Sequence, residues 1–117
     1  MFEIIEYALM IAGNVATGNY LAYTSTSDMR IVSIQACVQG TLPSGGNNLR
    51  FHIRVNDVDY PANSISIPAN GVDSYENQIF ATPISVLEGD ILYIVCDEVG
   101  SVNPGSWVEI RFGVEKQ

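Results

Sequence analysis

The stretch LRFHIRV, residues 49–55, is the clearest indication of the fold. Its apolar residues alternate strictly with polar ones: Leu49, Phe51, Ile53 and Val55 against Arg50, His52 and Arg54. Successive side chains of a β-strand point to opposite faces, so one face of this segment is apolar and the other polar. A helix would instead spread the four apolar residues around its circumference. The stretch therefore predicts a half-buried strand.

The same alternation recurs before and after this stretch. In WVEIRFGV, residues 107–114, it predicts that four residues are buried and two exposed: Val108, Ile110, Phe112 and Val114 against Glu109 and Arg111. In MRIVSIQACV, residues 29–38, it places one apolar set opposite one more polar set: Val32, Ile34, Ala36 and Val38 against Ser33, Gln35 and Cys37. Two further half-buried strands are expected here.

The run DILYIVCDEV, residues 90–99, differs because it is apolar on both faces. Leu92, Ile94 and Cys96 form one face, and the other is formed by Ile91, Tyr93 and Val95. Such a strand is expected to be covered on both sides. One face of a strand in a two-layer domain points outward, so either a second chain or the N-terminal segment folded back must cover it. We expect Ile91, Tyr93 and Val95 to form an oligomer interface.

The remaining expected strands, and the turns between them, predict one all-β domain. Further strands are expected near residues 3–12, 20–23, 64–67 and 77–86, and the turns TLPSGGNN, PANGVDS, LEGD and GSVNPGS separate them. About eight short strands without a helical period favour a single-domain antiparallel β-sandwich of the jelly-roll type. Residues 16–117 are expected to form the sandwich, and residues 1–15 either an N-terminal arm or its first strand.

Composition excludes several classes of function. The 117 residues include 13 acidic residues against 5 Lys and Arg, a formal charge of -8. Phosphate would repel such a chain, which argues against binding to nucleic acid. The apolar opening MFEIIEYALMIAG is interrupted by Glu3 and Glu6 and is shorter than the ~20 residues that span a bilayer, so neither a membrane anchor nor a signal peptide is expected.

The sequence gives little support for a catalytic or metal-binding site. His52 is the single histidine and falls on the polar face of a regular strand, so a surface histidine is favoured over a catalytic triad. Asp57 and Asp59 are expected in a polar hairpin turn rather than a calcium site, which needs six to eight ligands. Asp97 and Glu98 are consecutive on a strand and face opposite ways, so they cannot act as a glycosidase pair. We expect no enzymatic activity, no cofactor and no bound metal.

Structural roles also account for the two cysteines and for the aromatic residues. Cys37 and Cys96 are not spaced as zinc ligands, and two buried thiols are favoured over a disulfide. Trp107 and the six tyrosines could stack on sugars, but aromatic residues are equally favoured in strands and at protein interfaces. Carbohydrate binding therefore stays open as an alternative.

Three blocks carry a resemblance to a known family: residues 30–56 (RIVSIQACVQGTLPSGGNNLRFHIRVN), 87–101 (LEGDILYIVCDEVGS) and 103–114 (NPGSWVEIRFGV). They resemble a β-sandwich module of phage virion proteins. The matching positions lie in turns and strand ends: Pro43, Gly45, Val55, Asn56, Gly89, Asp90, Asp97, Val99, Gly100, Pro104 and Gly105. The pattern usually has Asn-Gly after the second strand, whereas this chain has Asn56-Asp57, so a looser or different hairpin is expected there.

The resemblance implies a virion component. The favoured interpretation is a capsid decoration or cement protein on the capsid surface that binds the major capsid protein and copies of itself, often as a homotrimer. A tail-fibre or baseplate module that binds host-surface carbohydrate is the alternative. We expect the N-terminal segment to supply the capsid contacts, through Phe2, Ile4, Ile5, Tyr7 and Leu9.

Overall fold

Eight strands form the fold in a computed structural model that describes residues 3–72 and 74–116, with only the backbone of residues 3–6, 21 and 22. In chain order they are β1 (Glu3–Asn14), β2 (Gly18–Thr24), β3 (Met29–Val38), β4 (Leu49–Val55), β5 (Val58–Ile67), β6 (Tyr75–Val86), β7 (Ile91–Glu98) and β8 (Ser106–Lys116). Within that part of the chain no helix could span a membrane.

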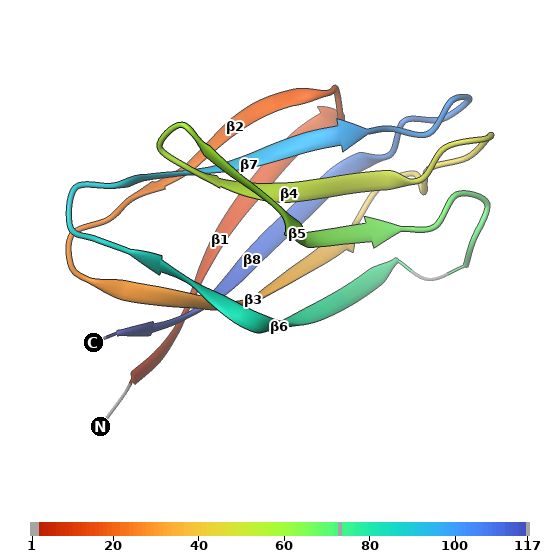
Figure 1. Cartoon of the computed structure of the whole chain (residues 1–117). Helices are drawn as coiled ribbons and strands as arrows, with labels where there is room; N and C mark the ends of the chain where they lie inside the picture. Colours follow the sequence, from red (N-terminus) through yellow and green to blue (C-terminus); the bar gives the residue numbers. More distant parts are fainter. Residues whose placement is uncertain (1–2, 73, 117) are drawn as a thin grey trace.

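The strands lie in two facing antiparallel sheets (Figure 1). The first sheet has the order β1-β8-β3-β6, and the second has the order β2-β7-β4-β5. Every connection except the β4–β5 hairpin therefore crosses from one sheet to the other. This is the connectivity of the eight-stranded jelly roll, which is built from two Greek keys. The predicted all-β, jelly-roll-like sandwich is confirmed.

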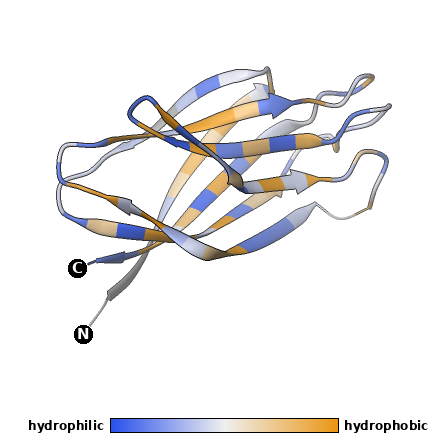
Figure 2. Cartoon of the chain, viewed as in Figure 1, coloured by the Kyte–Doolittle hydropathy of each residue, from blue (hydrophilic) through white to orange (hydrophobic). Residues whose placement is uncertain are grey.

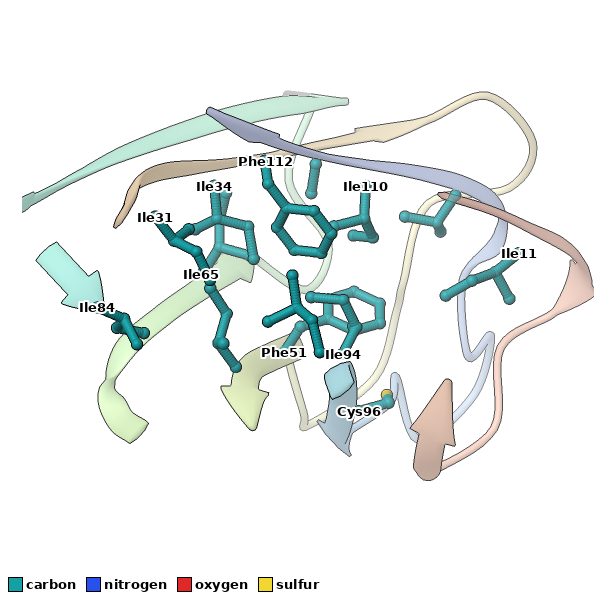
Figure 3. Close-up of a cluster of buried hydrophobic side chains, with 14 of the residues drawn as sticks. Ile11, Ile31, Ile34, Phe51, Ile65, Ile84, Ile94, Cys96, Ile110 and Phe112 are labelled. Carbon is teal, nitrogen blue, oxygen red and sulfur yellow. The ribbon is translucent and has the colours of Figure 1, made fainter. Parts of the chain in front are cut away.

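The core fills the space between the two sheets. Phe112, Ile34 and Ile110 point inward from the first sheet, and Phe51 and Ile94 point toward them from the second (Figure 3). The inward sets predicted for β4 and β8 are all buried, and the bands of alternating hydropathy along β4 are visible in Figure 2. Burying a large apolar side chain stabilises a fold by about 1.5–3 kcal/mol, so this alternation is the main determinant of the sandwich.

One predicted face is wrong in part. Val32 was expected to point inward, but it is only half-buried, and Ile31 is fully buried instead. The cause is a β-bulge: the pairing of β3 with both β6 and β8 shifts register between Ile31 and Ser33. A bulge inserts one extra residue and reverses the alternation beyond it. From Ile34 to Val38 the predicted faces hold.

Strand β1 is an edge strand of the first sheet. It pairs with β8 along its length, from Glu3 opposite Lys116 to Asn14 opposite Ser106. Tyr7 and Leu9 are half-buried against the core. The Tyr7 ring stacks on Tyr23 of β2, in the other sheet, with ring centroids 4.3 Å apart. The described part of residues 1–15 therefore forms the first strand of the domain rather than a detached arm.

The connections β3–β4, β5–β6 and β7–β8 meet at one end of the sandwich (Figure 1). Backbone hydrogen bonds fasten the first of these loops to the third: Ser44 N donates to Asn103 O over 3.0 Å, and Val102 N donates to Ser44 O over 2.9 Å. The backbone segments of these loops approach so closely that a Cβ atom on Gly100 would lie 1.9 Å from Asn103 O. The loops at this end are thus one hydrogen-bonded unit.

The β4–β5 hairpin turns through Asn56 and Asp57, between the paired residues Val55 and Val58. Asn56 adopts a left-handed φ of 53°. Two-residue hairpin turns require such a backbone conformation, which Asn tolerates better than most residues. The turn is therefore tight although the usual Asn-Gly pair is missing, and the looser alternative is wrong.

Candidate functional surfaces

An ion-pair cluster lies on the outer face of the second sheet. His52 of β4 is at its centre, with Nδ1 2.8 Å from Asp97 Oδ2 of β7 and Nε2 2.8 Å from Asp59 Oδ1 of β5. Arg54 Nε donates to the same Asp59 oxygen over 2.8 Å. Arg50 Nε lies 3.9 Å from Asp97 Oδ2. We call these five residues the His52 cluster.

The cluster favours the protonated form of its histidine. Burial opposes protonation, but the hydrogen bonds to Asp59 and Asp97 outweigh it and raise the pKa of His52 above its usual value of 6.5. The Arg54 hydrogen bond, followed by that of His52, lowers the pKa of Asp59 to about 2. A neutral imidazole has one donor and one acceptor nitrogen, whereas the imidazolium donates from both. Two facing carboxylates are therefore satisfied only by the charged ring.

Sequence reasoning misplaced two members of this cluster. His52 was expected at the surface, but it is only 8% exposed. Asp59 was expected in a turn with Asp57, but it lies in β5 and pairs with His52 and Arg54. Asp57 does lie in the turn. A cross-strand charge pair between β4 and β5 could have been anticipated from the hairpin register, since Arg54 and Asp59 are directly opposite.

The predicted oligomer interface lies on the same outer face. The structure confirms that β7 buries Leu92, Ile94 and Cys96 in the core and turns Ile91, Tyr93 and Val95 the other way. The three outward residues are not equivalent. Val95, opposite His52, is already buried within the single chain, with 9% of its surface exposed, while Ile91 and Tyr93 are half-buried. Of the three, Ile91 and Tyr93 are therefore the residues that keep more accessible surface within the single chain.

The strongest exposure of apolar side chains is elsewhere. Eight large apolar residues of the described chain are exposed, and four of them share the outer face of the first sheet: Met10, Tyr75, Ile79 and Trp107. The other four lie in loops or at strand ends: Val58, Val72, Leu87 and Val102. Trp107 also has a left-handed φ of 53°, which is unusual for a bulky residue. Strict alternation in the sequence gave no sign of this conformation.

The residues expected to contact a capsid fall into two groups: those outside the described residues and those that pack on the core. Phe2 and the side chains of Ile4 and Ile5 lie outside the described residues. Tyr7 and Leu9 pack against the domain's own core. The outward residues of the described part of β1 include Met10, which is 43% exposed.

No metal centre or disulfide is formed by the described residues. They contain no group of three or more His, Cys, Asp or Glu side chains placed to hold a metal ion. Cys37 and Cys96 are free thiols, Cys37 half-buried and Cys96 buried. Burial raises the pKa of Cys96 to about 11, so its thiolate is disfavoured at neutral pH.

Comparisons with known proteins point to the fold. No protein-family profile matches this chain. No curated protein matches it either. Among solved structures it is similar to a chain from the acidic stable capsid structure of Helicobacter pylori bacteriophage KHP30, with a TM-score of 0.65 and 11% sequence identity. The match covers 100% of this chain and 94% of that one, so the whole domain shares its fold with a chain of similar length from a phage capsid.

Proposed function

We propose that this protein is a bacteriophage structural protein that decorates or cements the capsid, with no catalytic role. The observation that carries this proposal is the whole-length likeness to a chain from a phage capsid structure. The jelly roll recurs in viral capsid domains, although lectins and cupins also use it. The resemblance of the turn and strand motifs to phage virion modules, found independently from the sequence, favours the first of these.

The mechanism is attachment at many equivalent points. Copies of the chain associate through the outer face of β7, around Ile91 and Tyr93, and a homotrimer is the expected assembly. The segment that carries Phe2, Ile4 and Ile5 binds the major capsid protein on the outer surface of the virion. A stable contact needs about 800 Å² per partner. Linked copies bind far more tightly than single ones, so modest individual contacts suffice to reinforce a shell.

Light scattering on the purified protein tests the association of copies. We expect an oligomer, and Tyr93→Asp is expected to convert it to monomers with an unchanged far-ultraviolet spectrum, because a charge would be buried in the contact. Tyr75→Asp is the matched control: Tyr75 lies on the outer face of the other sheet, and its replacement should leave the oligomer intact. An oligomer that persists in Tyr93→Asp would refute this interface.

Co-sedimentation with phage heads that lack the protein tests the location. Pelleting with heads supports capsid decoration. Pelleting with tails, or with neither particle, would refute it and favour the tail-fibre or baseplate alternative.

A further inference from the structure

The outer face of the first sheet carries an open depression of about 280 Å³. Strand β3 forms its floor through Gln35, Ala36 and Cys37, while Tyr75 of β6 and the pair Glu109 and Arg111 of β8 form opposite sides; Gln39 completes the lining. Tyr75 and Glu109 both lie opposite Cys37 in the sheet register. Two strand spacings therefore separate them, about 10 Å. The volume is near the lower end of the ~300–1,000 Å³ of small-molecule sites.

One exposed aromatic residue lines this depression, and a second contacts the lining through its backbone. Tyr75 is 52% exposed and Trp107 is 51% exposed. Trp107 is outside the lining but is joined to it through the backbone, because its carbonyl oxygen accepts a hydrogen bond from Gln39 N over 2.8 Å. A non-glycine residue in the left-handed region costs about 1–2 kcal/mol. Outliers of this kind concentrate at functional sites, where another interaction offsets the strain.

The polar groups of the depression are mixed and balanced in charge. Arg111 Nε donates to Glu109 Oε1 over 2.7 Å, which fixes the orientation of both groups. Gln35 and Gln39 add two amides, and each amide has both donor and acceptor atoms. The depression is thus close to neutral on a chain whose formal charge is -8.

We propose that this depression binds a neutral carbohydrate, with Tyr75 as the stacking platform and with Glu109, Arg111 and the two glutamines contacting the hydroxyl groups. A sugar ring presents an apolar C–H face and a rim of hydroxyls that donate and accept, which matches an aromatic ring beside amides and an oriented carboxylate. A second protein surface fits less well, since charged residues are depleted from the cores of protein interfaces. An acidic sugar would be repelled by the net charge of the chain. The inference does not depend on the proposed capsid role.

Titration of the whole protein with glucose, galactose, mannose and N-acetylglucosamine tests the proposal, with sialic acid as the charged comparison. Trp107 is the single tryptophan and its backbone is bonded to Gln39 of the lining, so its fluorescence serves as the optical readout. Amide chemical shifts identify the residues affected. We expect saturable binding of at least one neutral sugar in the millimolar range, with shifts confined to β3, β6 and β8, and no binding of sialic acid.

Three variants separate binding from folding. Tyr75→Ala should weaken binding about tenfold, while Tyr75→Phe should retain it, because stacking needs the ring and not the hydroxyl group. Glu109→Gln should weaken binding by removing the oriented carboxylate. Val58→Ala, at an exposed position of the other sheet, should bind as the original protein does, and equal unfolding temperatures verify that the variants fold. No saturation with any neutral sugar, or equal binding by Tyr75→Ala, would overturn the proposal. So would shifts at β3, β6 and β8 that follow protein concentration without sugar, since these would indicate a contact between copies.

Discussion

The Nδ1 atom of His52 lies 2.8 Å from Oδ2 of Asp97, across the pairing of β4 with β7. With Asp59 on the other ring nitrogen, this contact ties three strands of the second sheet together on the side away from the core. The two contacts together need the charged imidazole, so the stability of the fold should depend on pH.

The domain should be most stable in mild acid. The pKa of His52 is raised above 6.5, so its contribution is complete below that pH and is lost as the pH rises through the raised value. The pKa of Asp59 is lowered to about 2, so its contribution is present above 3.8 and is lost as the pH falls toward about 2. Maximal stability is therefore expected between these two limits, and thermal unfolding followed across the pH range measures it.

His52→Gln tests whether the cluster causes this dependence. The variant should lose about 1–3 kcal/mol at mildly acidic pH, because it leaves facing carboxylates without a charged donor. The loss should shrink in alkaline solution, where His52 of the original protein is also neutral. Arg50→Gln is the control and should change stability by less than about 0.5 kcal/mol, since Arg50 is exposed and 3.9 Å from its partner. A loss that is the same at every pH would contradict the assignment.

Deletion of residues 1–11 should destabilise the domain severely. It removes most of β1, including Tyr7, Leu9 and Ile11, which pack against or within the core. Their burial contributes at least about 3 kcal/mol by area, so chemical denaturation should show loss of a cooperative transition or a much lower midpoint.

Deletion of residues 1–6 is the matched comparison. It spares Tyr7, Leu9 and Ile11, so the shortened chain should fold, and by the proposed function it should no longer bind capsids. A chain without residues 1–11 that unfolds at the original midpoint would show that β1 is dispensable.

Gly100→Ala should cost about 1–3 kcal/mol, the usual effect of forcing atoms into a packed site. The added methyl group would meet Asn103 O at 1.9 Å and Ser44 N at 2.7 Å, so the hydrogen-bonded loops would have to separate. Gly46→Ala, in the same group of loops, is the control, because its nearest contact is Ser101 Oγ at 3.8 Å. Denaturant midpoints of the two variants compare the costs directly, and equal midpoints would contradict this account of the loops.

Much of the fold could be predicted because alternation reports burial one residue at a time. In β4 and β8 every predicted inward residue is buried, and in β7 both faces were assigned correctly. The prediction failed at Val32 because a bulge shifts the alternation without changing composition. Strand β5 was expected from residue 64 but begins at Val58, since Pro61 is tolerated on an edge strand.

The surfaces were harder to predict because they depend on register between strands. Nothing in LRFHIRV indicates that His52 is enclosed, since Asp97 and Asp59 reach it from two other strands. The depression beside Tyr75 likewise combines β3, β6 and β8. The left-handed backbone of Trp107 has no signature in its sequence, where glycine would have been the usual residue.

The pairing of β1 with β8 also constrains how the chain acquires its structure. These are the first and the last of the eight strands, and in the first sheet β1 is bonded to β8 alone among the described strands. During synthesis the apolar β1 therefore stays unpaired in its sheet until β8 has left the ribosome. Sandwiches dominated by such distant pairings fold in milliseconds to seconds, far more slowly than helical bundles. During this interval the unpaired β1 of the nascent chain is open to association with other chains. Such association must be avoided until β8 pairs with it, although in the folded domain β1 is no longer unpaired.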